Sequence, residues 1–348
     1  MHKHAKMASR RCLAAMLLVL PGLTLCSCAS QTKTQTVADL TADTGDSFMG
    51  DWVGTRRGDD GSTTEFVAQV LALGDNAYRM NILDAFDMGL EPTTVLDATL
   101  DGGKVTFAGV AGHDAQGEGV FEGTTLKGRY RGEGAGSFEM NRVIRLSPSV
   151  GQKPLKGAVV LFDGNDTEEW QHPGKDGPIT WPIIDGAMQV AKGNVVTKGK
   201  FRDYKLHLEF RTPYMPTQRG QGRGNSGVYL AGRYEIQVLD SYGLEGLDNE
   251  CGGIYRVARP RVNACAPPGQ WQTYDIAFRA PRSDNNQKKT DNARLTVIHN
   301  GVTIHDKIEL PGPTGGALDG DELQPGGIYL QDHGNPVQYR NIWVVEVE

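Results

Sequence analysis

The sequence has no excess of positive charge, no long apolar run and no sustained helical periodicity. Its 42 aspartates and glutamates outnumber 36 lysines and arginines, which argues against nucleic acid or anionic lipid headgroups as partners. The apolar run CLAAMLLVLPGLTL, which starts at Cys12, is too short and too broken by proline and glycine for a membrane span. With 45 glycines and 17 prolines, and without a 3.6-residue apolar period, the chain is predicted to be an all-β protein.

Cysteine is also scarce, and three of the five cysteines lie in an N-terminal segment with the layout of a secretory signal. The apolar run ends in LCSC (residues 25–28), which resembles a bacterial lipobox. We therefore expect residues 1–27 to be a lipoprotein signal peptide. Cys28 is expected to anchor the exported protein by lipid to a bacterial membrane, at the outer membrane or cell surface or facing the periplasm. An ordinary signal peptide cut near Ala29 is the alternative.

Removal of this leader and acylation of Cys28 leave only Cys251 and Cys265. Two cysteines on either side of a loop in an exported chain predict a disulfide. In the chain-entropy view such a bond contributes about 3 kcal/mol. Thiolate ligation of a metal is the alternative.

Composition divides the remaining chain into segments. Residues 28–46 are polar, lack apolar periodicity and are interpreted as a tether. Residues 47–146 contain short alternating runs between glycine-rich turns, which predict an accessory β-domain, a small antiparallel barrel or sandwich. SPSVGQKPLKG (residues 147–157) is predicted to link two independent cores. Longer strands in residues 158–348, with a hairpin signal at Asn300-Gly301, predict a jelly-roll sandwich.

The stretch GRYEIQVLDSY (residues 232–242) is the most informative in the second domain. As a strand it alternates an apolar face with a polar face formed by Glu235 and Gln237. We expect this strand to lie centrally in a hairpin, where its polar face would line a concave trough for a carbohydrate. A β-bulge between Gln237 and Asp240 would bring Asp240 onto the face of Glu235.

This pattern, Glu-x-Gln-x-x-Asp, resembles the Glu-x-Asp-x-x-Glu signature of laminarinase-type β-glucanases. Those enzymes use a similar sandwich, with the nucleophile and the acid/base flanking the bulge. Here Gln237 replaces the middle carboxylate and Asp240 is shorter than the usual glutamate. Ordinary double-displacement chemistry is therefore not expected.

Other segments beyond residue 158 occur in the order of one known family: VVLFDGNDTEEW, IIDGAM, YKLHLEFR, GNSGVYLAGRYEIQVLD, PGQWQTYDIAF, LTVIHNGVTIHD and GGIYLQDHGNPVQYRNIWVVE. Together they resemble the 3-keto-disaccharide hydrolase domain family. The resemblance implies a concanavalin A-like jelly roll that hydrolyses glycosides oxidised to a ketone at C3. It also implies a module that is commonly secreted or lipid-anchored, in agreement with Cys28.

This chemistry indicates which residue types a site needs. A C3 ketone acidifies the hydrogen on C2, so a base can remove it, the C1 oxygen can leave by elimination, and water can add afterwards. A hydrogen-bond donor must polarise the ketone, and a divalent cation could take that role. We predict Glu235, His333 and Asp240 as catalytic residues, with Glu235 or His333 as the base. Substrate contacts are predicted for Gln237, Asn225, Gln331 and Asp332.

Two other functions stay open from the sequence. A conventional glycoside hydrolase would act on unoxidised glucans through Glu235 and Asp240, and a non-catalytic lectin-like module would bind carbohydrate in the same trough. Structural roles are the alternative for single residues. Glu235 and Gln237 could form the solvated face of an edge strand, and Asn225 could shape a turn. Asp240 could be the acceptor of an Asx-turn, and His333 an exposed turn residue. Arg223 and Arg233 are expected to be ordinary surface charges.

Overall fold

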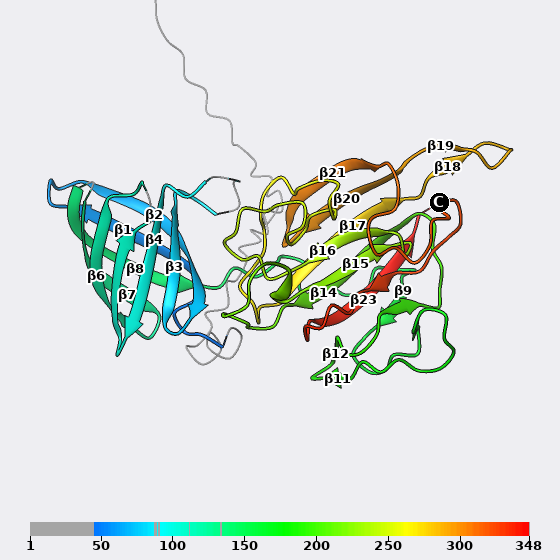
Figure 1. The fold of residues 1–348 in the computed structure, drawn as a ribbon, viewed down its shortest axis with the longest axis horizontal. Coiled ribbons are helices and arrows are strands. Elements are labelled where there is room, and N and C mark those ends of the chain that lie inside the picture. The colour runs from blue at the N-terminus through cyan, green and yellow to red at the C-terminus, as the bar shows by residue number, and fades with distance from the viewer. Residues whose placement is uncertain (1–44, 87–88, 90, 111, 133, 348) are drawn as a thin grey trace, which may run out of the picture. The chain divides into compact units, whose positions relative to one another are not determined.

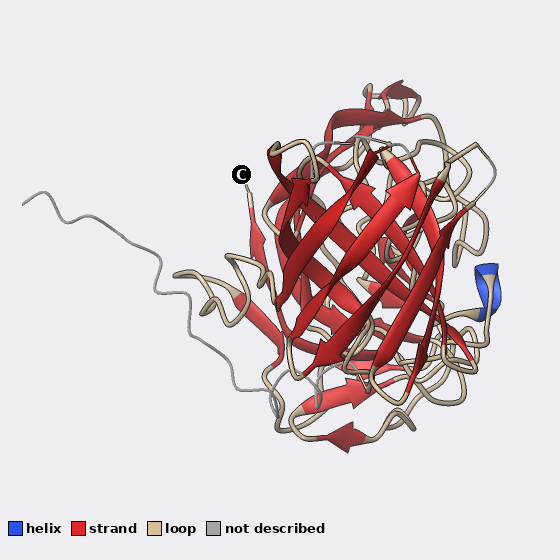
Figure 2. Cartoon of the chain, turned by 90° about the vertical axis from the view of Figure 1, so that its left-hand side faces the viewer, coloured by secondary structure: helices blue, strands red, loops and turns tan. Residues whose placement is uncertain are grey.

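The computed structural model describes residues 45–86, 89, 91–110, 112–132 and 134–347. The expected signal peptide, the anchor Cys28 and most of the tether lie outside these described residues. The described part is all-β, as predicted (Figures 1 and 2): a closed antiparallel barrel precedes antiparallel sheets that form a sandwich. A single turn of 3₁₀ helix occupies Gly220–Gly222. No helix in the described part of the chain is long and apolar enough to span a membrane.

The barrel contains eight strands, and pairing of β1 with β8 closes it. Its strands are β1 (Gly50–Gly58), β2 (Thr63–Gly74), β3 (Ala77–Leu83), β4 (Thr94–Asp101), β5 (Lys104–Gly109), β6 (Ala115–Glu122), β7 (Thr125–Gly132) and β8 (Gly134–Val143). Alternation fills the interior: in β5, Val105 and Phe107 are buried while Lys104 and Thr106 are exposed. Closure leaves the barrel without a free strand edge.

The sandwich has a five-stranded and an eight-stranded sheet. The smaller runs in the order β10 (Trp170–Gln171), β13 (Val195–Thr197), β22 (Tyr329–Leu330), β15 (Ser226–Leu230) and β16 (Tyr234–Val238). The larger runs in the order β11 (Ile183–Ile184), β12 (Ala187–Gln189), β23 (Gln338–Glu346), β14 (Tyr204–Arg211), β17 (Gln272–Arg279), β20 (Ala293–His299) and β21 (Val302–Leu310), with β9 (Val159–Phe162) also on β23. A small ribbon pairs β18 (Arg282–Ser283) with β19 (Lys289–Asp291).

The two sheets pack face to face over one apolar core. Tyr234 of β16 and Phe278 of β17 meet with ring centroids 5.6 Å apart. The Tyr274 hydroxyl of β17 donates to the Gln237 carbonyl of β16 at 2.7 Å. This packing fixes the apolar face of β16 inward, so its other face is turned away from the core.

Two predictions about hairpins have different outcomes. Asn300 and Gly301 join β20 to β21 with φ of 50° and 83°, the left-handed geometry that such a turn requires, so this hairpin is confirmed. The expected central position of the strand from Tyr234 is wrong, because β16 is the last strand of its sheet. Its edge is covered instead by a loop, with the Gln237 N–H donating to the Gly253 carbonyl at 2.9 Å.

The predicted linker is attached to the outer face of the eight-stranded sheet. The Ser149 hydroxyl donates to Asp275 Oδ2 at 2.6 Å, and the Gly151 N–H donates to Glu209 Oε1 at 2.5 Å. Asn341 Nδ2 donates to the Gln152 carbonyl at 2.9 Å. We call residues 147–152 the strap. Because the strap covers this face, charged side chains are buried there that the alternation of side chains along the strands would otherwise place in solvent.

Candidate functional site

The face of the five-stranded sheet that points away from the core carries the polar side chains. Tyr229 lies opposite both Glu235 and Tyr329 in the strand register. The rings of Tyr229 and Tyr329 are 4.7 Å apart and form, with Val196, an apolar cluster separate from the main core. We call the following set the floor: Val196, Gly227, Tyr229, Glu235, Gln237 and Tyr329.

Glu235 is the acidic group of the floor, and it is only 3% exposed. Burial raises its pKa to about 7, although a hydrogen bond with Tyr229 lowers it. Its backbone is fixed on both sides, by Thr314 Oγ1 at 2.9 Å and by the Tyr255 N–H at 3.3 Å. No ion pair in the described part of the chain involves Glu235. A carboxylate of this kind can exchange a proton near neutral pH.

Gly227 provides the space that this carboxylate occupies. A Cβ atom added to Gly227 would lie 2.4 Å from Glu235 Oε1 and 3.1 Å from the Tyr229 ring. Real side chains do not approach so closely, so any larger residue would displace the carboxylate. The backbone of Gly227 lies within β15, and its small size is what the site requires.

The Tyr229 hydroxyl connects Glu235 to a second predicted residue, Gln331. It donates to the Gly315 carbonyl at 2.9 Å and accepts from Gln331 Nε2 at 3.2 Å. Burial, followed by the charge of Glu235, raises the pKa of Tyr229, so its hydroxyl stays protonated. Sequence reasoning missed Tyr229, although a Gly-x-Tyr pattern that starts at Gly227, Gly253 and Gly327 was a signal that could have identified it.

An amide network places two more predicted residues beside the floor. Gln237 Nε2 donates to Gln221 Oε1 at 3.0 Å, and Asn225 Nδ2 donates to the Gln221 carbonyl at 2.8 Å. The Asn225 N–H donates to Asn335 Oδ1 at 2.8 Å, which joins this network to the turn after Gln331. Asn225 Oδ1 is buried and has no hydrogen-bond partner in the described residues. This oxygen lacks the donor that a buried acceptor usually has.

Asp240 is not part of the polar floor. The ladder of β15 and β16 is continuous up to Val238, so the bulge predicted after Gln237 is wrong. Arg223 Nε donates to Asp240 Oδ2 at 2.6 Å in a buried pair, and the Tyr242 N–H approaches Asp240 Oδ1 at 3.4 Å. Burial raises the pKa of Asp240, and Arg223 opposes this rise. Asp240 therefore balances Arg223, which is buried and not the surface charge that we expected.

The turn that carries His333 adjoins the same network. His333 is exposed, and Asp332 shapes the turn by accepting from the Gly193 N–H at 2.8 Å and from the Gly334 N–H at 2.9 Å. Both Asp332 oxygens are thus used by backbone groups. Gln331, two residues before His333, reaches the floor directly.

Two further expectations concern the environment of Arg233 and a possible metal site. Arg233 is buried and pairs with Asp319 at 2.6 Å, so it too is not an ordinary surface charge. Among the described residues, no group of three or more His, Cys, Asp or Glu side chains could hold a metal ion.

The disulfide predicted between Cys251 and Cys265 is not formed, because both residues are buried free thiols. The sulfur of Cys251 lies 3.3 Å from the Tyr274 hydroxyl, and that of Cys265 approaches the Leu239 carbonyl at 3.6 Å. A hydrogen bond between the two thiols and burial raise the pKa of Cys265. Cys265 is thereby kept as the thiol, which is less reactive than the thiolate.

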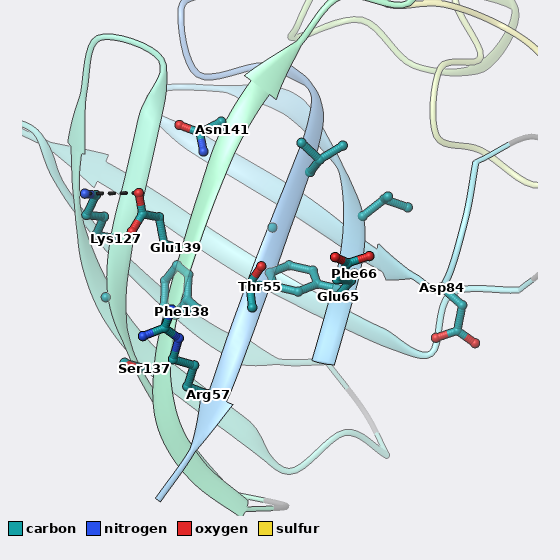
Figure 3. Close-up of a pocket in the computed structure, with 14 residues that line it drawn as sticks. Thr55, Arg57, Glu65, Phe66, Asp84, Lys127, Ser137, Phe138, Glu139 and Asn141 are labelled. Atoms are coloured by element: carbon teal, nitrogen blue, oxygen red, sulfur yellow. Dashed lines mark ion pairs between the residues drawn. The ribbon is translucent and has the colours of Figure 1, made fainter. Parts of the chain in front are cut away.

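A cavity of about 770 Å³ lies elsewhere, on the barrel (Figure 3). Its lining includes Thr55, Arg57, Asn141 and an ion pair between Lys127 and Glu139 at 3.0 Å. None of the predicted site residues lines it.

Comparisons with known proteins bear on the sandwich. A family profile described as the 3-keto-alpha-glucoside-1,2-lyase-like domain matches residues 157–345. A crystal structure of a "putative glycosyl hydrolase" from Parabacteroides distasonis is 38% identical, with a TM-score of 0.51, and covers 55% of this chain and 84% of that one. A second structure of the same description and organism is 18% identical, with a TM-score of 0.41, and covers 56% and 95%. No curated protein matches the chain.

The matched family agrees with the resemblance found in the sequence. The match spans more than half of the chain and includes every residue of the floor. The family name implies a carbohydrate substrate. This protein belongs to the 3-keto-alpha-glucoside-1,2-lyase-like domain family.

Proposed function

We propose that this protein cleaves glycosides that carry a ketone at C3, by elimination across C1 and C2 followed by hydration. The observation that carries the proposal is Glu235, a buried carboxylate without a cationic partner and with a pKa of about 7. A base with this pKa is half deprotonated near neutral pH and is regenerated readily after it has taken a proton.

The reaction can be written with the groups of the floor. The Glu235 carboxylate takes the proton from C2, and the electron pair of that bond forms an enolate with the C3 oxygen. As the ketone re-forms, the C1–C2 double bond forms and the C1–oxygen bond breaks, and the leaving oxygen takes a proton. Water then adds across the double bond to give the free 3-keto sugar. The protonated Tyr229 hydroxyl lies next to Glu235 and, by turning its one hydrogen from the Gly315 carbonyl to the substrate, would stabilise the enolate oxygen.

Other residues have supporting roles in this proposal. Gln331 orients Tyr229, and Gln237 and Asn225 bind sugar hydroxyls through the amide network. His333, exposed in the turn two residues after Gln331, serves as the proton donor to the leaving oxygen. Of the two residues considered as the base from sequence, Glu235 is favoured because it lies in the floor beside Tyr229.

The geometry argues against a conventional glycoside hydrolase. That chemistry requires a pair of carboxyl groups flanking the scissile bond. Asp240 is held by Arg223, and both oxygens of Asp332 accept backbone N–H groups. Glu235 therefore has no second free carboxylate as partner among the predicted site residues. A lectin, in turn, has no use for a buried carboxylate with a raised pKa, because burial of that charge weakens the fold.

Turnover in deuterated water tests the proposal. The purified protein is incubated with a 3-keto disaccharide and, separately, with its unoxidised counterpart, and the products are analysed by NMR and mass spectrometry. Abstraction at C2 predicts deuterium at C2 of the released 3-keto sugar, and a transient enone detectable by ultraviolet absorbance. Direct attack of water at C1 would leave C2 unlabelled. Free 3-keto glucose without enzyme is the control, because the ketone alone exchanges slowly.

We also propose that the protein is exported and anchored through lipid on Cys28, on the basis of the lipobox-like LCSC sequence. Cys28→Ala should release the protein from membranes or block its processing. Fractionation of this variant with membranes after a salt wash would contradict the anchor.

A further inference from the structure

A second cavity, of about 400 Å³, adjoins the floor of the sandwich. It is lined by parts of β10 and β13, by the turn between β15 and β16, and by the segment from Leu318 to Gly327. Val196 belongs both to this lining and to the floor cluster with Tyr229 and Tyr329. The cavity and the floor are therefore neighbours on the same sheet.

The strand geometry gives the separation between the cavity and Glu235. Arg233, which lines the cavity, precedes Glu235 by two residues, and Gly327 precedes Tyr329 by two. Two residues of extended chain span about 7 Å. The cavity thus begins roughly one sugar ring from the carboxylate. If C2 of the substrate lies at Glu235, the leaving group on the neighbouring C1 would reach the cavity.

The wall of this cavity is held in place by a buried cation. Arg233 Nε donates to Asp319 Oδ1 at 2.6 Å, and its Nη1 donates to the Gln324 carbonyl at 3.0 Å. Arg233 is only 3% exposed, so its charge is used within the wall. These bonds attach the segment from Leu318 to Gly327 to the hairpin that carries Glu235.

Several other polar side chains of the lining make no direct polar contact within the described structure, although the charge of Lys200 acts on Asp319 and helps to lower its pKa. No hydrogen bond or ion pair of the described residues involves the side chains of Gln171, Lys200, Asp321 or Gln324. Lys200 and Asp321 carry opposite charges, and Val196 and Leu318 add apolar surface. Convergent polar groups on a partly apolar wall are typical of a ligand site of this volume. The balanced charge suits a neutral, polyhydroxylated ring better than an anion.

We propose that this cavity is the subsite for the sugar on the leaving side of the scissile bond. The inference rests on the proposed function, because it takes Glu235 to mark the reacting ring. In this proposal, Gln171, Lys200 and Asp321 bind the leaving group. They therefore determine whether the enzyme prefers a sugar or a small alkyl leaving group. These three side chains, together with that of Gln324, can donate to or accept from ring hydroxyls.

The test compares two substrates that share the reacting ring: a 3-keto disaccharide and the methyl 3-keto-glucoside. The measured quantity is the ratio of kcat/KM for the disaccharide to that for the methyl glycoside. Leu318→Trp fills the cavity from an exposed position and should lower this ratio at least tenfold. Lys200→Ala should lower it about threefold to tenfold, as expected for one lost hydrogen bond. Lys198→Ala, an exposed neighbour outside the lining, is the matched control and should leave the ratio unchanged.

An unchanged ratio in Leu318→Trp and Lys200→Ala, with the fold intact, would overturn the subsite. If the wild-type protein turns over neither substrate, the proposed function fails, and the cavity is then tested by titration with glucose. Binding that is retained in Lys198→Ala and lost in Leu318→Trp would support a sugar site without catalysis. Absence of binding to the wild-type protein, or equal binding to Leu318→Trp, would overturn it.

Discussion

Two glutamates of the sandwich are both buried, but their pKa values are shifted in opposite directions. Glu235 lies in the floor of the five-stranded sheet and is 3% exposed, and Glu209 lies on the outer face of the eight-stranded sheet and is 0% exposed. Burial raises the pKa of Glu235 to about 7. Burial also raises the pKa of Glu209, but hydrogen bonds overcome this effect and lower it to about 2.

The partners of Glu209 explain the difference. Its oxygens accept from Arg340 Nε at 2.7 Å, from Asn341 Nδ2 at 2.8 Å and from the Gly151 N–H at 2.5 Å. His207 lies 3.8 Å away and binds Asp275 at 2.6 Å. Although burial lowers the pKa of His207, Asp275 and Glu209 raise it above its ordinary value.

Burial alone therefore does not distinguish a reactive carboxylate from a structural one. Glu209 is compensated by charge and by hydrogen bonds, and it stabilises the attachment of the strap. Among the described residues, Glu235 has only Tyr229 as a side-chain partner, and an uncompensated carboxylate of this kind is typical of a functional site.

Glu235→Gln should lower turnover roughly 10²–10⁴-fold, as expected for loss of a general base. The same change should stabilise the protein. With a pKa of about 7 in the folded state, Glu235 keeps a proton that the unfolded chain loses above its ordinary pKa near 4.5. Stability is thus lost as pH rises from about 4.5 to 7, so the variant should gain about 3 kcal/mol at pH 8 and nothing at pH 4. Denaturant unfolding at both pH values measures this difference in stability. Near-normal turnover of the variant would show that Glu235 is not the catalytic base.

Glu209→Gln is the matched substitution and should have the opposite effect on stability. It leaves Arg340 without its counter-charge and His207 with Asp275 alone, which should cost about 3 kcal/mol at pH 7. The folded fraction should keep the turnover of the wild type, because Glu209 lies on the outer face of the other sheet. If urea unfolding shows that the Glu209→Gln variant is more stable than the wild type, the partners of Glu209 do not compensate its buried charge.

The wild-type rate should depend on pH through the Glu235 carboxylate. Because the base is the deprotonated form, kcat/KM should fall about tenfold per unit below pH 7. Glu209 stabilises the fold above its unfolded pKa near 4.5, and this contribution is lost as pH falls toward 2. The rate should therefore fall at pH values where the fold is intact. Circular dichroism across the same range separates the two effects, and a rate that is flat from pH 5 to 8 would contradict the assignment.

Gly227→Ala should displace the Glu235 carboxylate without removing it. The added methyl group would lie 2.4 Å from Glu235 Oε1, so the carboxylate must move. Small displacements of reacting groups are costly, and we expect a fall in kcat of roughly tenfold. Gly312→Ala, where a Cβ would meet nothing within 4 Å, is the control. Equal kcat values for the two variants would mean that the position of Glu235 is not critical.

Ser149→Ala should have the smallest effect, confined to the strap. It removes the hydroxyl that donates to Asp275 at 2.6 Å, which should cost about 1 kcal/mol of unfolding free energy. Thermal unfolding measures the change, and hydrogen exchange at Gly151 should rise with it. No change in either would indicate that the strap is held by other contacts.

Local patterns in the sequence predicted some of these features correctly. Alternation from Tyr234 to Val238 placed Glu235 and Gln237 on the face away from the core, and Asn300-Gly301 identified a hairpin. Both depend on neighbours in sequence, where the period of a strand or the geometry of a turn is sufficient information.

Features that depend on distant residues were not predicted. Alternation in β14 places His207 outside the core, but it does not show that the strap will cover it or that Asp275 will bind it. Arg223 similarly meets Asp240 only through the folding of an intervening hairpin. The edge position of β16 is set by strand order, which no pattern within the strand contains.

The strap also has a consequence for the order in which the chain matures. Ser149 and Gly151 leave the ribosome before the strands whose surface they bind, and Arg340 and Asn341 come from β23, the last strand described. The contacts of Ser149 and Gly151 need only β17 and β14, whereas the contact of Gln152 with Asn341 needs β23 as well. A polypeptide interrupted before Arg340 would keep Glu209 without its cation and Gln152 without its donor. The complete set of strap contacts thus marks a chain whose last described strand has joined the sheet.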